Sequence, residues 1–240
     1  MRVWRHSERA EAPSFDIPQA DSNPPPNAAS AQRPSPAGEK NREFLAQMSR
    51  GSDLLSQGKP EEALEVLTNA ARLNPKDEDV HYNLGLALAR LHNFDQAIRE
   101  YKTALSIFPN YVEAHNNLGN ALMQVGRTRE AIQQFEEAVK VMPDYASAHN
   151  NLGTALQKAG RISEALPQFQ EAVALKPDYW QARFNLGMTY LQEKRPDQAR
   201  KEFETVRRLE PSFEPADAAI AAIDKKLSDL GPENSPPPKD

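Results

Sequence analysis

A glycine recurs every 34 residues through most of this chain, at positions 85, 119, 153 and 187. Two of these glycines end the same motif, Ala-His-Asn-Asn-Leu-Gly, at 114–119 and 148–153. Other residue types keep the same spacing: Ala97, Ala131, Ala165 and Ala199; Tyr101, Phe135, Phe169 and Phe203; Pro109, Pro143, Pro177 and Pro211. A fixed period of this length identifies a repeat array, in which each copy packs against its neighbours.

One further step back from Gly85 reaches Gly51, so the array contains five units. They span 44–77, 78–111, 112–145, 146–179 and 180–213. Within each unit, apolar residues recur three and four positions apart, which predicts two amphipathic helices. In the third unit we expect these helices at about 112–125 and 129–141. A proline closes every unit and prevents the second helix from continuing.

This pattern resembles the tetratricopeptide repeat at nearly all of its diagnostic positions, over about 170 of the 240 residues. The resemblance implies an all-α protein in which helix-turn-helix units form an α-solenoid, wound as a right-handed superhelix. It also implies that the first helix of each unit lines a concave groove. Repeat proteins of this kind gain their stability from the packing of neighbouring units.

The segments outside the array differ from it in composition. Residues 1–43 are rich in proline, alanine and serine and have few apolar side chains, which predicts a disordered tail. Residues 214–230 predict a helix that caps the last unit, because a solenoid end would otherwise expose its apolar face. The apolar stripe of this helix consists of Ala219, Ile220, Ile223 and Leu227. Residues 231–240 are again rich in proline and predict a second disordered tail.

Composition excludes several classes of function. The net charge is −5, so the chain has no broad basic field for nucleic acid, and we predict no nucleic-acid partner. There is no cysteine, which excludes disulfides and thiolate metal sites. We find neither a signal peptide nor an apolar run of the roughly 20 residues that cross a bilayer. These features predict a cytoplasmic protein with no membrane insertion and no cofactor.

Three histidines, His81, His115 and His149, occupy the same place in successive units. At least one helix-packing distance of about 8–10 Å separates them, whereas ligands of a shared zinc each lie about 2 Å from it. We therefore interpret them as packing residues and predict no metal site. None of the common nucleotide-binding, zinc-protease or serine-hydrolase motifs occurs, and we predict no catalytic residue and no enzymatic activity.

Asparagines recur on the first helix, one residue before a core leucine, at Asn83, Asn117, Asn151 and Asn185. Asparagine is a mediocre helix former, and its amide offers both a donor and an acceptor, which match the backbone of an extended peptide. We predict that these residues bind a peptide in the groove; the alternative is duplication of an ancestral unit without present use. Five further groove-facing residues are assigned to the same site: Asn116, Asn120, Asn150, Tyr82 and Phe184.

Taken together, the sequence predicts a non-catalytic adaptor that binds an extended segment of another protein. Two alternatives are a self-assembling scaffold, which would be a homo-oligomer, and an accessory subunit of a separately encoded modifying enzyme. Family members that bind chaperone tails use a cluster of Lys and Arg, whereas Gln181 and Asn185 occupy the matching places in unit five. The recurring residues Asn83, Asn117, Asn151 and Asn185, called the asparagine ladder below, are more similar to the repeats of O-linked N-acetylglucosamine transferase, although no transferase domain follows.

Overall fold

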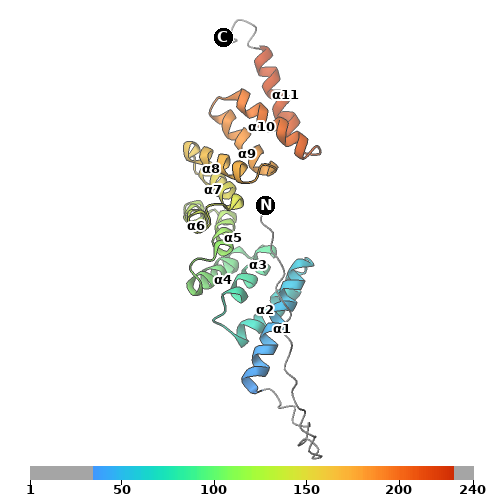
Figure 1. Ribbon diagram of the computed structural model, residues 1–240, viewed down its shortest axis with the longest axis vertical. Coiled ribbons are helices and arrows are strands. Elements are labelled where there is room, and N and C mark those ends of the chain that lie inside the picture. Colours follow the sequence, from blue (N-terminus) through green and yellow to red (C-terminus); the bar gives the residue numbers. More distant parts are fainter. Residues whose placement is uncertain (1–34, 230–240) are drawn as a thin grey trace, which may run out of the picture.

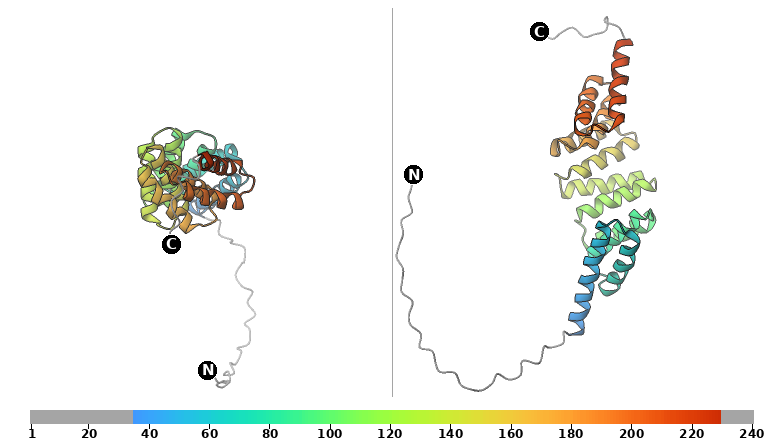
Figure 2. Two further views of the ribbon diagram at one scale, coloured as in Figure 1. Left: turned by 90° about the horizontal axis from the view of Figure 1, so that it is seen from above. Right: turned by 90° about the vertical axis from the view of Figure 1, so that its right-hand side faces the viewer.

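The computed structural model describes residues 35–229, apart from the side chains of residues 227 and 228. Within this range the chain forms eleven α-helices and no strand (Figure 1). Their bounds are α1 Pro36–Ser56, α2 Pro60–Leu73, α3 Glu78–Arg90, α4 Phe94–Ile107, α5 Val112–Gln124, α6 Thr128–Val141, α7 Ala146–Lys158, α8 Ile162–Leu175, α9 Trp180–Gln192, α10 Pro196–Leu209 and α11 Glu214–Asp229. The helices stack into an elongated α-solenoid, also seen in Figure 2, and this confirms the predicted fold class.

Each repeat contributes one odd-numbered helix, here called helix A, and one even-numbered helix, called helix B. Helix B packs against helix A of its own repeat and against helix A of the next repeat. Successive A helices also contact one another directly, as α3 does α5 and α5 does α7. Because the A helices lie closer together along the stack, they form its inner, concave side.

The first helix begins earlier than the sequence predicts. Helix α1 starts at Pro36, inside the segment 1–43 that we expected to be disordered, so the prediction is wrong for residues 36–43. Local helix-starting signals explain the difference. Ser35 caps the helix by accepting a hydrogen bond from the Gly38 amide (3.2 Å), and a proline occupies the first turn. The rest of the two predicted tails, at 1–34 and 230–240, lies outside the described residues.

Helix α1 is also the longest helix, at 21 residues, and carries polar and charged side chains along its length. Across residues 35–229, no helix has both the length and the apolar character that crossing a membrane requires.

The glycine that marks the period lies where the two helices of one repeat cross. In repeat three, a Cβ atom added to Gly119 would lie 2.5 Å from the Phe135 ring, which is only 1% exposed. Repeats two, four and five place Tyr101, Phe169 and Phe203 against their own glycines in the same way. A larger residue would displace the ring from the core, so only glycine allows this helix crossing.

The turn between helix A and helix B requires a left-handed backbone conformation in every repeat. Gly58, Gly126 and Gly160 provide it with φ values of 72°, 77° and 77°. In repeats two and five, His92 and Lys194 take the same position, each with φ 58°. A residue with a Cβ atom is disfavoured in this region, so the turns of repeats two and five are intrinsically less favourable.

A histidine in the first turn of helix A joins two other segments of the repeat array. In His115, Nε2 lies 2.9 Å from the Pro109 carbonyl oxygen, and Nδ1 lies 2.9 Å from the amide oxygen of Gln134 on helix B. His149 makes the equivalent contacts in repeat four. Both side chains are buried, so they are packing residues, as their spacing predicts.

Pairs that include a glutamate replace this arrangement in the outer repeats. In repeat two, His81 Nδ1 lies 2.7 Å from the Glu100 carboxylate. In repeat five, Arg183 takes the place of the histidine and donates to Glu202 at 2.7 Å. Both of these bridges again connect helix A to helix B of the same repeat.

Helix α11 covers the end of the array by packing against α10. Ile220 and Ile223 are buried and belong to the same core cluster as Phe203 of repeat five. Ala219 is partly buried against this cluster, while the side chain of Leu227 lies outside the described residues. The capping role predicted for this helix follows from these contacts.

Candidate peptide-binding groove

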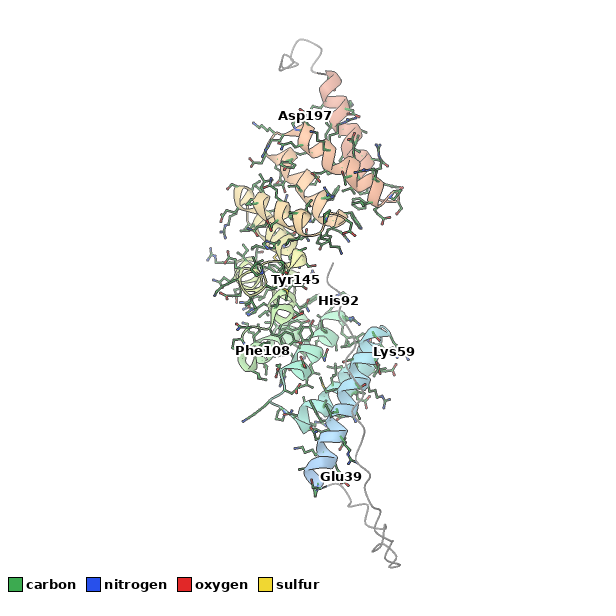
Figure 3. All side chains as sticks on the ribbon, in the orientation of Figure 1. Glu39, Lys59, His92, Phe108, Tyr145 and Asp197 are labelled. Atoms are coloured by element: carbon green, nitrogen blue, oxygen red, sulfur yellow. The ribbon has the colours of Figure 1, made fainter. Side chains whose placement is uncertain are left out.

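The concave side combines exposed amides in its centre with apolar side chains. Asn120 and Gln124 on α5 and Thr154 on α7 are exposed, and so is Met188 on α9. Figure 3 draws the side chains of the described residues on the whole solenoid. The sequence assigned Asn120 to the peptide site, and its amide is available to a ligand.

The asparagine ladder joins successive repeats. Three of its members use their amide nitrogen to donate a hydrogen bond to the repeat before. The bonds are Asn117 to the Tyr82 hydroxyl (3.0 Å), Asn151 to Asn116 Oδ1 (2.9 Å) and Asn185 to Asn150 Oδ1 (3.0 Å). Each bond therefore holds two neighbouring A helices together, a role that the sequence interpretation did not include.

Asn116 and Asn150 differ from the expectation that they face a peptide. They are only 6% and 7% exposed, because each lies against helix A of the next repeat. Asn150 also donates to Asn151 Oδ1 at 3.4 Å. Asn185, Asn150, Asn151 and Asn116 thus form one continuous chain of amides across three repeats. Their burial makes Asn116 and Asn150 poorly accessible to a ligand.

Asn83, the fourth ladder position, is not part of this chain. The repeat before it places Met48 at the site that Tyr82 and the buried asparagines occupy elsewhere. Since a thioether is a weak acceptor, Asn83 has no suitable partner there. Its amide forms no hydrogen bond with any of residues 35–229.

A hollow of 250 Å³ lies between α3 and α5. Leu86 and Phe94 contribute apolar walls, while Asn117, Asn120 and Gln124 contribute amides. Arg90 also lines the hollow. Apolar walls with a few polar groups suit one side chain and the adjoining backbone of an extended peptide. Phe94 was absent from the predicted site because it belongs to helix B, which the period places outside the groove.

Phe184, another predicted site residue, lies in an aromatic cluster at the last junction. Its ring is 5.5 Å from that of Phe203 and 5.0 Å, edge-on, from that of Phe213. Trp180 also contacts Phe213, at 4.8 Å between ring centroids. Phe184 is partly buried by these contacts, so much of its surface packs repeat five against the start of α11.

Tyr82 lies in a second cluster, at the junction of repeats two and three. Its ring is 4.8 Å from that of Tyr111, whose hydroxyl donates to Asp79 at 2.7 Å. Burial, and after it the nearby Glu113 carboxylate, raises the pKa of Tyr82 to about 12. The same two causes raise the pKa of Tyr145, which Figure 3 labels at the next junction. These tyrosines therefore remain neutral at physiological pH.

Comparison with known families identifies the repeat. Two family models described as tetratricopeptide repeat match the chain, one over residues 111–178 and the other over residues 48–112 and 150–212. The chain belongs to the tetratricopeptide repeat family. Comparison with curated proteins finds no significant match.

Solved structures with the same fold include MamA from Desulfovibrio magneticus RS-1, which is 27% identical with a TM-score of 0.65. That match covers 71% of this chain and 97% of the solved MamA chain, which runs from residue 41 to the end. YrrB, described as a TPR protein with an unusual peptide-binding site, is 22% identical with a TM-score of 0.63, covering 75% of this chain and 94% of YrrB. PilF of Pseudomonas aeruginosa is 21% identical with a TM-score of 0.65, covering 82% and 95%. The last two likenesses establish the shared fold alone.

Proposed function

We propose that this protein is an adaptor that binds an extended segment of another protein along its concave groove. The observation that carries the proposal is the hollow between α3 and α5, where Leu86 and Phe94 meet the exposed amides of Asn120 and Gln124. An extended peptide would place one apolar side chain in the hollow, and its backbone would bond to the amides.

The asparagine ladder has a narrower role in this proposal than its recurrence predicts. The amide nitrogens of Asn117, Asn151 and Asn185 already donate to the preceding repeat. Each amide has two N–H bonds and an oxygen that accepts, so a ladder member retains groups for a ligand. We assign the main contacts to Asn120 and Gln124, with the ladder as support.

The test uses peptides selected from a random phage-displayed library on the full-length protein. Asn120→Ala combined with Gln124→Ala removes hydrogen bonds worth about 0.5–1.5 kcal/mol each. The double variant should bind the selected peptides about five- to a hundredfold more weakly. Calorimetric titrations measure this change, and thermal melts of the same samples show whether the fold is retained.

The matched control lies on the outer side of the same repeat. Gln133 and Glu136 on α6 are exposed, so changing both to alanine should leave peptide affinity unchanged. Equal affinity of the groove variant and the parent would disprove the proposal, as would a failure to select any peptide that the groove variant binds more weakly.

Three narrower statements belong to the same proposal. We propose that the protein acts without catalysis and that it works in the cytoplasm. We also propose that its repeats are similar to those of O-linked N-acetylglucosamine transferase and that its ladder serves protein recruitment.

A further inference from the structure

We propose that the junction of repeats two and three binds the cationic side chain of an arginine or lysine in the partner segment. The site consists of Tyr82 and Tyr111 together with the carboxylates of Asp79 and Glu113, and is called the tyrosine–carboxylate site below. This inference rests on the proposed function, because it names the chemistry of one residue in the bound peptide.

The tyrosine rings supply the first element of recognition. Tyr82 and Tyr111 lie 4.8 Å apart with their planes inclined by 33°, which keeps both rings fixed. Asn117 donates to the Tyr82 hydroxyl at 3.0 Å and so orients this ring. Both tyrosines are half-buried, so part of each remains accessible. The face of a tyrosine ring attracts a cation within about 6 Å of its centre.

The carboxylates supply the second element. Asp79 and Glu113 are both exposed at the start of successive A helices. Asp79 accepts the Tyr111 hydroxyl at 2.7 Å, which places this carboxylate beside the ring pair. Glu113 acts on both rings, since its charge contributes to the raised pKa of Tyr82 and Tyr111.

Neither carboxylate is neutralised by a group in the described part of the chain. Among residues 35–229, no lysine, arginine or histidine forms an ion pair with Asp79 or Glu113. This distinguishes them from Glu100, Glu130 and Glu202, each of which has a basic partner. Two unneutralised carboxylates beside neutral aromatic rings favour a basic group from outside.

The rest of the groove lacks this combination. Ser147 and Gln181 take the position of Asp79 and Glu113 in repeats four and five, although Tyr179 continues the row of aromatic residues. A cationic side chain of the peptide is therefore recognised at one end of the groove, and uncharged residues of the peptide are recognised at the other end. Such asymmetry fixes the direction in which a peptide lies along the array.

The first arm of the experiment measures the cation directly. Nα-acetyl-arginine methylamide is titrated into full-length protein that carries ¹³C-labelled tyrosine, and the ring signals are followed by NMR at low salt. The neutral isostere Nα-acetyl-citrulline methylamide is the matched probe. We expect shifts of Tyr82 and Tyr111 with the arginine compound only. Asp79→Asn combined with Glu113→Gln should weaken its binding about five- to tenfold.

A second arm uses a gain of charge. Ser147→Glu places a carboxylate beside Tyr145 and Tyr179, and should add a second set of shifting ring signals with the arginine compound. Equal responses to the arginine and citrulline compounds in the parent protein would overturn the inference. So would an arginine response that the Asp79 and Glu113 variant retains in full.

The third arm connects the site to the peptide. Peptides selected on the parent protein should be enriched in arginine or lysine at one position, and peptides selected on the Asp79→Asn, Glu113→Gln variant should lose this enrichment. Peptides that need Asn120 and Gln124 but show no basic preference would overturn the inference and leave the proposed function standing. Peptide affinity that is independent of Asn120 and Gln124 would overturn both.

Discussion

Repeats three and four differ from repeats two and five at the same three places. In the inner pair, glycine forms the turn, His115 and His149 contact neutral glutamines, and buried asparagines accept bonds from the next repeat. In the outer pair the corresponding groups are a non-glycine turn, a contact between a basic side chain and a glutamate, and an aromatic ring. One backbone fold thus supports a nearly uniform neutral centre and two chemically distinct ends.

The difference follows from what each repeat contacts. An inner repeat has a copy of itself on one side, so a buried amide can rely on an amide partner there. Repeat two instead packs on the atypical first repeat, and repeat five packs on α11. Helix α11 offers no ladder asparagine to repeat five, where Phe184 fills the space. In repeat two, Tyr82 takes the place of a buried asparagine and still accepts a bond from Asn117 of repeat three.

The largest expected effect on the free energy of unfolding comes from replacing a glycine at a helix crossing, in the middle or at the end of the array. Gly119→Val should destabilise the protein by about 3 kcal/mol, because the new side chain meets the Phe135 ring. Gly187→Val meets Phe203 in the same way, but at the end of the array. Urea unfolding followed by circular dichroism should show a lower midpoint of the main transition for Gly119→Val. For Gly187→Val it should show early unfolding of the last repeat, with the main transition retained. Parent-like melting of both would refute this packing.

Pro167 is an irregularity between the two inner repeats. It lies inside α8, where it removes one backbone donor, whereas Gln133 takes the same position in α6. Pro167→Gln should stabilise the protein by about 1–3 kcal/mol. The midpoint of urea unfolding is the readout. A fall in the midpoint would mean that repeat four depends on the shape that proline imposes on α8.

The ladder provides a sharper comparison. Asn151→Ala should cost about 1–2 kcal/mol, because it leaves the buried Asn116 oxygen without its donor. The matched change Asn83→Ala removes no hydrogen bond within residues 35–229. It should be neutral or stabilise by up to about 0.5 kcal/mol through better helix propensity. Thermal and urea melts of both variants test this contrast. Equal effects would show that the ladder bonds add nothing to stability.

The smallest effect concerns the turns. His92→Gly should stabilise repeat two by about 1 kcal/mol or less, because glycine adopts the left-handed conformation without a Cβ penalty. Gly126→Ala should have the opposite sign in repeat three. Differential scanning calorimetry resolves such shifts. The same sign for both changes would contradict the assignment of strain to His92.

The period was sufficient to predict the array, since its glycines, aromatic residues and prolines each have one place in the packed unit. It did not predict the start of α1, because the signals at Ser35 and Pro36 are local and occur outside the period. The bond from Asn151 to Asn116 also escaped prediction. It joins residues 35 positions apart in neighbouring repeats, whereas the helical pattern of one repeat shows only where an asparagine lies within that repeat.

The Asn-Asn doublets were the available signal for these bonds. In each doublet the second asparagine can donate to the preceding repeat and the first can accept from the following repeat, so copies of the doublet complement one another. The hollow between α3 and α5 had no such signal. It depends on how the Phe94 side chain from helix B enters the groove, and a pattern of sequence positions does not contain that direction.

The doublet has a consequence for the length of the array. A unit such as 112–145 presents a donor toward the repeat before it and an acceptor toward the repeat after it. An inserted copy of this unit would therefore find a matching partner on both sides, and insertion between repeats three and four should lengthen the solenoid without creating an unsatisfied amide. Met48 and Phe184 offer no amide and end the series. The inner repeat is an interchangeable building block, and the outer repeats determine where the series of blocks stops.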